Sequence, residues 1–530
     1  MANLTMSGAR HIKLRNLTFT RTTNHGPLVE FSIFPSIEDS CSHILLEGNE
    51  FVGVYADPGQ SLRLALLTSE FNNYLDSVVV VNNIFRKGQV AIAFTSSQTT
   101  GSGIVIENNL IEEPTQYGIT LYQLNAPRVI KNEVRMLTSP AGKQFREGIS
   151  VAACNGKLEI LNNRVTINLV GTIASSSVTG IEIFACNGNT TRGLVANNFV
   201  RVNFQSSAHT NYTGNGITLF ASKNQDVLFN TLRVGGGLTA SSSKALYFFS
   251  GEGNHRLQNN ISVNLAGGYA LWVEGSSLPL NQSDYNNFLS SGSNLVRWGN
   301  TDYSNLASYQ TGTGKDLNSL SSDPLFVSSD DLHIKSGSPV DGKGTPLAEV
   351  PRDIDNQLRS LAVPDIGADE YTAQRIIIKR KNKLNKILLP LTITRDSLHI
   401  DPTDDPMISG YVLSDVNVFI DTLVHTNLAD LEISLTHKGV IDTLAKFLPD
   451  SASGFIGTIL DDSGLLALNE GVSPYTGSYR PHSPLSVFNG VDPEGEWVLE
   501  IYDRSSGNFG ILDAWGIELV FEQTTGVPDE

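Results

Sequence analysis

The segment Val80-Val81-Asn82-Asn83-Ile84-Phe85 carries a pattern that recurs about ten times in the first 290 residues. An apolar, usually β-branched stretch runs into a corner that contains asparagine, and a second apolar pair follows. Clear further copies are Ile106-Glu107-Asn108-Asn109-Leu110-Ile111, Leu161-Asn162-Asn163-Arg164-Val165, Ala196-Asn197-Asn198-Phe199-Val200 and Leu257-Gln258-Asn259-Asn260-Ile261-Ser262. Aligned on one asparagine, the copies fall 23 to 35 residues apart, at Asn16, Asn49, Asn83, Asn109, Asn132, Asn163, Asn198, Asn230, Asn260 and Asn287. This period predicts a solenoid, and strand-sized segments between turns predict a β-solenoid with an asparagine ladder at one corner.

After each corner comes a strand with an apolar residue at every second position, as in Gly118-Ile119-Thr120-Leu121 and Gly180-Ile181-Glu182-Ile183. Because side chains alternate across a strand, we expect Ile and Leu to point inward and their neighbours outward. The segment before this strand is long at 132–148, 163–180 and 198–216. We expect these insertions to project from one edge of the stack, which in solenoids is often the binding face.

This pattern resembles the right-handed parallel β-helix repeat family, the architecture of pectate lyases, other polysaccharide lyases, several glycoside hydrolases and many bacterial surface proteins. The resemblance covers residues 1–371 and implies a β-helix of about ten rungs. Its last part, from Asp323-Pro324-Leu325-Phe326 to Pro364-Asp365-Ile366-Gly367-Ala368-Asp369-Glu370-Tyr371, is similar to the closing segment of secreted bacterial β-helix proteins. We expect this segment to cap the open edge of the last rung.

Composition narrows the range of partners and compartments. The 37 basic and 54 acidic residues give a net charge of −17, which argues against nucleic acid as a partner. No stretch approaches the ~18 apolar residues of a membrane span. Met1–Arg10 lacks the apolar core of a signal peptide, so we expect a fragment whose targeting segment, first rungs and cap have been removed. Composition and resemblance together favour an extracellular or cell-surface bacterial protein, which we expect to be a monomer.

The three cysteines exclude a disulfide scaffold. Cys154 and Cys186 nevertheless occupy matching rung positions, about 4.8 Å apart if the alignment is right. Both a disulfide and a pair of stacked thiols fit this placement, and the thiols are the favoured interpretation.

The character of the chain changes after Tyr371. Residues 372–395 contain a basic run from Arg375 to Lys386, which favours a solvated linker over a nucleic-acid or membrane patch. Residues 396–523 carry five blocks in order, and a tail follows at 524–530. The blocks are 423–435, 473–481, 484–490, 495–503 and 510–519.

These blocks closely resemble the P domain of kexin-like proprotein convertases, a β-sandwich of jelly-roll type. Alternating strands such as Trp497-Val498-Leu499-Glu500-Ile501 support a sandwich independently of the resemblance. No Ser-His-Asp protease context accompanies the blocks, so we expect an accessory module and no protease. The sequence identifies no cofactor with certainty. Asp461, Asp462 and Asp503 suggest calcium, and solvated turn acids are the favoured alternative.

The outward positions of the second strand predict a binding surface. Read across the rungs, they give an aromatic strip with one acid among them, at Tyr122, Glu182, Phe184, Phe220, Tyr247, Phe249 and Trp272. Exposed, these rings suit stacking on sugars. Covered by the insertions or by the C-terminal domain, they are ordinary packing, and the sequence leaves both interpretations open.

Catalysis is also left open by the sequence. Glu182 and Glu274 lie three rungs apart, about 14 Å, which is too far for a glycosidase pair. A polysaccharide lyase needs a base and a cation, which Lys143, Arg146, His209 and Tyr212 on two insertions could supply. The sequence therefore predicts a β-helix protein that binds polysaccharide, with lyase-type cleavage as a hypothesis. The alternative is a non-catalytic adhesive or structural surface protein.

Overall fold

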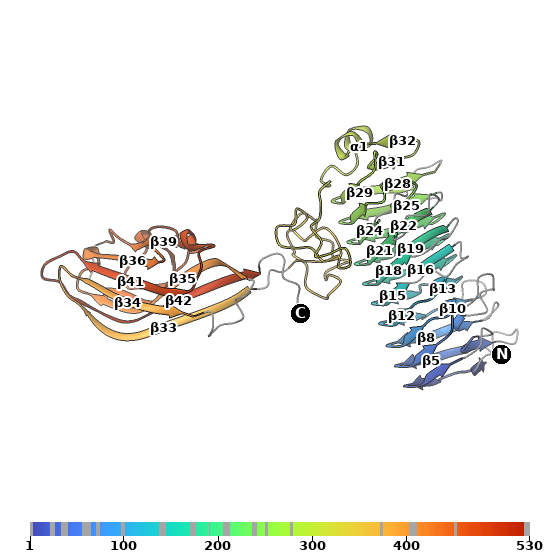
Figure 1. The fold of residues 1–530 in the computed structure, drawn as a ribbon, viewed down its shortest axis with the longest axis horizontal. Helices are drawn as coiled ribbons and strands as arrows, with labels where there is room; N and C mark the ends of the chain where they lie inside the picture. The colour runs from blue at the N-terminus through green and yellow to red at the C-terminus, as the bar shows by residue number, and fades with distance from the viewer. Residues whose placement is uncertain are drawn as a thin grey trace. The chain divides into compact units, whose positions relative to one another are not determined.

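The computed structural model forms two compact units, Met1–Tyr371 and Thr372–Glu530. Figure 1 shows a stack of parallel strands in the first and long, twisted strands in the second. The described residues are 4–21, 27–32, 41–55, 65–69, 75–96, 101–136, 145–169, 176–189, 191–204, 212–235, 241–249, 253–275, 279–371, 375–401, 411–449 and 453–523.

Within these residues, the first unit contains three sheets whose strands pair in parallel from rung to rung, except for a final antiparallel pair, β31–β32. Sheet A consists of β1 (Leu4–Ser7), β4 (Val29–Ser32), β7 (Ala65–Ser69), β10 (Val90–Thr95), β13 (Tyr117–Tyr122), β16 (Phe145–Ala152), β19 (Ser176–Phe184), β22 (Tyr212–Phe220), β25 (Lys244–Phe249), β28 (Tyr269–Glu274), β31 (Val296–Trp298) and β32 (Thr301–Tyr303). Sheet B consists of β2 (Lys13–Arg15), β5 (Cys41–Glu47), β8 (Leu75–Val81), β11 (Val105–Glu107), β14 (Arg128–Ile130), β17 (Glu159–Leu161), β20 (Gly193–Ala196), β23 (Gln225–Leu228), β26 (His255–Gln258) and β29 (Leu280–Asp284). Sheet C consists of β3 (Thr18–Thr20), β6 (Glu50–Val52), β9 (Ile84–Arg86), β12 (Leu110–Glu112), β15 (Glu133–Met136), β18 (Arg164–Leu169), β21 (Phe199–Phe204), β24 (Thr231–Val234), β27 (Ile261–Asn264) and β30 (Asn287–Ser290). The predicted parallel β-helix is confirmed.

The core of this unit follows the predicted alternation. Ile119, Leu121, Ile181 and Ile183 are fully buried, and the residues between them in each strand are more exposed. Cys154 and Cys186 are buried free thiols on adjacent rungs. The residues that follow them, Asn155 and Asn187, pair in a parallel β-bridge.

The corner between sheets B and C contains the asparagine ladder. Each ladder amide before the last donates from Nδ2 to Oδ1 of the asparagine on the next rung, over 2.9 to 3.1 Å, and the last, Asn286, donates to Asp316. The ladder consists of Asn49, Asn83, Asn109, Asn132, Asn163, Asn198, Asn230, Asn260 and Asn286. The residue before each takes the left-handed conformation, as Asn82 (φ 57°) and Asn108 (φ 53°) do. In an Asn-Asn pair the first asparagine thus bends the backbone in the left-handed conformation, and the second forms the hydrogen bonds between rungs.

The predicted alignment is off by one residue at both ends. Asn16 has a φ of 55° and occupies the bending position, so that Leu17 takes the ladder position and donates its N–H to Asn49. At the other end Asn286 is the ladder residue, and Asn287 pairs with Ile261 within sheet C. At the first end a single asparagine, Asn16, stands where several other rungs have two, and at the other end the pair Asn286-Asn287 begins one residue later than elsewhere. The sequence pattern alone does not show which asparagine of such a rung bonds across the ladder.

A hairpin and a short helix close the C-terminal end of the stack. The helix α1 (Leu306–Thr313) follows β32, and its fully buried Tyr309 packs on Trp298 and Tyr303. Figure 1 shows α1 and β32 beyond the last rungs. This differs from the expectation that residues 323–371 cover the last rung.

Most of the segment 323–371 packs instead along the side of the stack. Its apolar residues cover outward-facing side chains of sheets B and C, as Val350 covers Phe229 and Ile354 covers Phe199. These outward apolar residues need cover, which is the physical reason for the side-on position. We call this segment the side cap.

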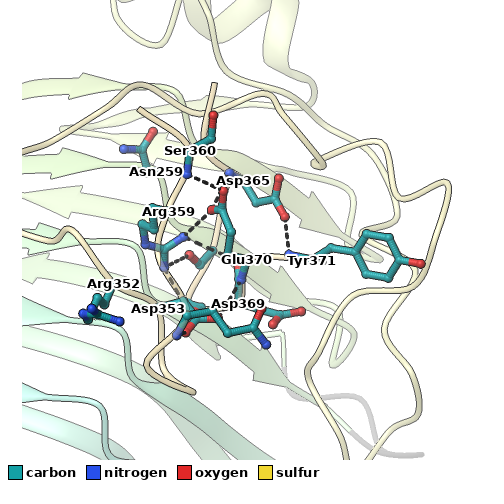
Figure 2. A network of polar contacts seen from close by, with 12 residues as sticks. Asn259, Arg352, Asp353, Arg359, Ser360, Asp365, Asp369, Glu370 and Tyr371 are labelled. Atoms are coloured by element: carbon teal, nitrogen blue, oxygen red, sulfur yellow. Dashed lines mark hydrogen bonds and ion pairs between the residues drawn. The ribbon is translucent and has the colours of Figure 1, made fainter. Parts of the chain in front are cut away.

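Polar contacts fix the side cap to the corner of the stack (Figure 2). The buried guanidinium of Arg359 bonds Glu370 at 3.1 Å and the side chain of Asn197 at 2.8 Å. Two other bending asparagines donate to side-cap carbonyls, Asn162 to Asp353 and Asn259 to Thr345. The outward amides of the corner are therefore the anchor points of the side cap.

Two sheets packed face to face form the second unit, with Trp497 and Trp515 buried between them. One sheet has the order β33 (Arg375–Leu388), β42 (Gly510–Gln523), β35 (Tyr411–His425), β38 (Ser453–Leu460), β40 (Tyr475–Arg480) and β39 (Leu466–Ala467). The other has the order β34 (Ile393–Ile400), β41 (Gly495–Asp503), β36 (Leu431–His437) and β37 (Val440–Ala445). No helix in the described ranges is long and apolar enough to cross a membrane.

The prediction of a basic linker at 372–395 is wrong. Arg375–Leu388 is the edge strand β33, which pairs with β42 along its whole length, and β34 already begins at Ile393. The basic run alternates with residues such as Ile378 and Leu388 that face the core, and its lysines pair with acids such as Asp396, 2.6 Å from Lys386. Lysine on an edge strand discourages pairing with another chain, which explains a charge run inside a sheet.

Candidate functional site on the outer face of sheet A

The register of sheet A places the predicted outward residues in two continuous columns. The first column runs through Thr120, Ser150, Glu182, Thr218, Tyr247 and Trp272, and the second through Tyr122, Ala152, Phe184, Phe220, Phe249 and Glu274. The aromatic members of both columns are half-buried, so that part of each ring reaches the surface. The aromatic strip therefore exists as a surface feature.

The rings of this strip stack on one another. Phe184 and Phe220 lie 5.0 Å apart between ring centroids, and Phe220 and Phe249 lie 4.9 Å apart, with interplanar angles of 15° and 12°. Both faces of Phe220 are thus occupied, and it presents mainly an edge. On the rung before Phe184 the column holds Ala152, so that no ring covers the other face of Phe184 from that rung. We call this position the alanine step.

On the rungs near the C-terminal end of the stack, charged and polar side chains surround Trp272. Lys244 Nζ and the Arg297 guanidinium each lie 4.7 Å from its ring centroid. Glu274 accepts hydrogen bonds from Trp272 Nε1 at 2.9 Å and from the Tyr247 hydroxyl at 3.2 Å. Burial lowers the pKa of Lys244 to about 8. Trp272 is therefore held by charged neighbours, which cover much of the ring that the sequence assigned to sugar stacking.

A third outward column, which the sequence analysis missed, runs beside the first. It contains Tyr117, Glu147, Thr179, Asn215, Lys244 and Tyr269. Two consecutive buried residues separate it from the first column, as Gly118 and Ile119 separate Tyr117 from Thr120. A rule of strict alternation therefore assigns it to the wrong face. The recurring X-Gly pairs, Tyr117-Gly118 and Glu147-Gly148 among them, are the sequence signal that marks it.

Glu147 and Glu182 form a carboxyl pair on adjacent rungs, close to the alanine step. Their side chains bond each other, and burial followed by repulsion from Glu182 raises the pKa of Glu147 to about 8. Burial also raises the pKa of Glu182. The pKa of neighbouring Tyr117 rises to about 12, through burial and then the charges of both glutamates. Two carboxyls in contact cannot both ionise, so this pair holds one proton at neutral pH.

Two buried oxygens beside this pair have no hydrogen-bond partner. Thr218 is 5% exposed and pairs with Glu182 across the sheet, and its Oγ1 is unpartnered. Asn215 is 6% exposed, and its Oδ1 is also unpartnered, although its Nδ2 donates to Thr179. An unsatisfied buried polar atom costs roughly 1–3 kcal/mol, so a ligand that bonds these atoms recovers that energy.

Of the four predicted lyase residues, Arg146 is the one whose side chain the structure describes, and it does not reach this face. Arg146 is fully buried and its Nη1 lies 3.4 Å from the carbonyl of Asn168, so it cannot neutralise a substrate at the surface. Burial lowers its pKa to about 10. Its neighbour Glu147 points outward instead. Lys143, His209 and the side chain of Tyr212 lie outside the described residues.

The predicted calcium acids each bond a separate turn. Asp462 accepts the backbone N–H groups of Leu485 and Ser486 at 2.8 and 2.9 Å. Asp503 is buried against His425 at 3.1 Å, and Asp461 accepts the N–H of Ser463. In the part of the chain that the structure describes, these three acids do not converge on one point. The alternative of turn acids fits them better.

Comparison with known proteins gives little similarity. No family model matches the chain, and no curated protein matches it. Among solved structures, the serine protease of Aeromonas sobria in complex with its chaperone is 14% identical with a TM-score of 0.19, and the match covers 28% of each chain. The same protease alone is also 14% identical with a TM-score of 0.18, covering 30% of this chain and 31% of the other. The chain spans less than a third of these proteins, and similarity at this level assigns no function.

Proposed function

We propose that this is a secreted or cell-surface bacterial β-helix protein that binds a polysaccharide along the outer face of sheet A. One observation carries the proposal: half-buried rings lie on this face beside buried polar atoms that lack partners. The apolar C–H face of a sugar can stack on the aromatic rings, and its hydroxyl groups can bond the polar atoms. Binding sites commonly combine apolar walls with a few polar groups that fix the ligand's orientation.

The alanine step is the proposed centre of this surface. A sugar ring seated over Ala152 would stack on the open side of Phe184, with its hydroxyls toward Glu182 on the next rung. Thr218 lies two rungs from Ala152, where it would meet the following part of the polysaccharide. The rungs repeat at about 4.8 Å, so a polysaccharide running along the stack meets the outward side chains of one strand after another at that spacing. The stacked rings of Phe220 and Phe249 then contribute edges farther along.

Cleavage of the bound polysaccharide is a second candidate, favoured by the proton that Glu147 and Glu182 share. A carboxyl that stays protonated at neutral pH is suited to general acid catalysis, and its partner to general base catalysis. A lyase-type reaction also needs a cation for a uronate carboxylate, and Lys244, in the column of Glu147, lies three rungs or about 14 Å away, too far to act together with this pair. We propose that the second unit is an accessory module of the P-domain type.

The binding proposal is tested by titrating the full chain with a panel of neutral and uronate-containing polysaccharides in a calorimeter. Phe184→Ala should weaken the best binder by about 10-fold, because it removes the stacking surface. Ala152→Phe should abolish binding by filling the step. The fold should tolerate that change, because phenylalanines already stack along this column at Phe184, Phe220 and Phe249.

Tyr502→Ala is the matched control, since this tyrosine is 37% exposed on the second unit. It should leave affinity unchanged. Binding that survives Ala152→Phe would remove the alanine step from the proposal. No affinity for any member of a broad panel would favour the non-catalytic structural rod.

A further inference from the structure

The side cap contains three side chains whose metal-ligating atoms lie close together. They belong to a later part of the sequence than the outer face of sheet A, and the side cap packs on sheets B and C instead. One ligand atom each of His333, Asp355 and Asp369 lies within 4.8 Å of the other two. Ligand atoms about 2.1 Å from one ion lie up to about 4.2 Å apart, so small side-chain rotations complete the geometry. Asp355 is exposed and His333 partly so, which gives an ion access from solvent.

The imidazole of His333 is oriented as a ligand would be. Its Nδ1 contacts Oδ1 of Asp331, and its Nε2 lies 2.7 Å from Oδ2 of Asp355. A histidine that binds metal through one nitrogen almost always donates from the other to a carboxylate or carbonyl, which fixes the ring. Asp331 is placed for that role, and Nε2 faces the other two ligands.

The two carboxylates are held in the same way. Asp355 Oδ1 bonds the Arg164 guanidinium at 2.6 Å, and its other oxygen faces His333. Asp369 is 5% exposed, and its Oδ2 accepts the N–H of Ile334 at 2.8 Å. Figure 2 shows Asp369 within the polar network of the side cap, next to Asp353. Each carboxylate thus has one oxygen tied to a donor, and the supporting groups fix the ligand set.

A cavity of about 240 Å³ lies between sheet C and the side cap, and His333 is the one of the three ligands that lines it. His333 and Asp331 line it together with Arg164 and Arg201. It leaves room for water molecules or a small anion to complete the coordination of an ion beside His333. Structural sites usually enclose their metal with four protein ligands, whereas a site with three protein ligands keeps a position open.

We infer that His333, Asp355 and Asp369 form a divalent transition-metal site, for Zn²⁺ or Mn²⁺, with Asp331 as the positioning residue of the histidine. An imidazole nitrogen with two carboxylates suits these ions, whereas Ca²⁺ and Mg²⁺ prefer oxygen ligands throughout. The three ligands come from three separate stretches of the side cap. The ion therefore ties these stretches together and stabilises the side cap against the stack.

The test uses the untagged full chain, stripped with a chelator and titrated calorimetrically with ZnCl₂, MnCl₂, CaCl₂ and MgCl₂. We expect about one Zn²⁺ or Mn²⁺ per chain and weaker binding of Ca²⁺ and Mg²⁺. His333→Gln and Asp369→Asn should weaken Zn²⁺ binding by about 100-fold or more, and Asp331→Asn by about 10- to 100-fold. His399→Gln is the control, because His399 also contacts a glutamate, Glu496, but lies exposed on the second unit.

A second measurement needs no variant. In nitrogen NMR spectra of the histidine rings, Zn²⁺ should shift Nε2 of one ring while its Nδ1 remains protonated. Absence of a stoichiometric ion in the wild type, unchanged affinity in His333→Gln and Asp369→Asn, or a shift at Nδ1 instead would each overturn the inference. Tighter binding of Ca²⁺ than of Zn²⁺ would overturn the assigned metal class.

Discussion

Replacing Glu147 by Gln should change how stability depends on pH. In the folded protein the pair of Glu147 and Glu182 holds a proton up to about pH 8, the pKa of Glu147, whereas an unfolded glutamate releases it near its ordinary value of 4.5. Between these values the folded state binds more protons than the unfolded state. The free energy of unfolding must then fall as pH rises through this window, and the contribution of the pair is complete only below it.

The magnitude follows from the same shift. One proton gives a slope of at most about 1.4 kcal/mol per pH unit, or about 4 kcal/mol between pH 5 and pH 8. Glu147 and Glu182 are partly exposed, so screening by solvent reduces this, and we expect roughly 2 kcal/mol. Glu147→Gln removes the shared proton and should flatten the dependence by that amount.

The assay is urea unfolding of the full chain at pH 5, 6, 7 and 8, with the transition of the first unit analysed by itself. Other groups also titrate, so the quantity to compare is the difference between wild type and variant at each pH. Glu107→Gln, on the outer side of β11 in sheet B, is the control and should give a constant difference. A constant difference for Glu147→Gln as well would refute the shared proton.

Two further predictions concern stability. Asn163→Ala should cost roughly 4 kcal/mol in urea unfolding, because Val129 O loses its side-chain donor and the backbone N–H and Nδ2 of Asn132 lose their acceptor, Asn163 Oδ1. Asn108→Ala, at an exposed bending position, should cost about 1–2 kcal/mol. If both substitutions lowered the free energy of unfolding equally, the distinction between ladder and bending asparagines would be wrong. A fragment of residues 372–523 should unfold cooperatively, and one that starts at residue 396 should aggregate or fail to do so, because it lacks β33 and exposes the edge of β42. Cooperative unfolding of the shorter fragment at the same temperature would show that β33 is dispensable.

The rungs could be predicted from sequence because inward positions tolerate little but aliphatic side chains. Ile119 and Leu121 are buried and Thr120 is not, so alternation identifies the face directly. The ladder could be predicted because asparagine alone among common corner residues both bends the backbone and bonds along the stack. The predicted ladder positions were wrong by one residue at the two ends, Asn16 and Asn287. There the ladder position is occupied by the neighbouring Leu17 or Asn286.

The carboxyl pair could not be found by alternation. Gly148 lies so close to Val165 and Gly180 that an added Cβ would meet them at 2.3 and 2.6 Å, and the strand departs from strict alternation beside it. Glu147 therefore faces outward, next to Arg146, which is fully buried and not at the substrate position that the sequence analysis expected for it. The side cap depends on contacts between segments more than 100 residues apart, such as Asn162 with Asp353, which no local pattern contains.

The most direct test of glycan binding is a crystal structure of the full chain with an oligosaccharide of the polysaccharide it binds best. The account predicts a sugar ring over Ala152, stacked on Phe184, with hydroxyls bonded to Glu182 and with Thr218 Oγ1 bonded farther along the oligosaccharide. An oligosaccharide bound on sheet B, on sheet C or on the second unit, with the outer face of sheet A empty, would contradict it.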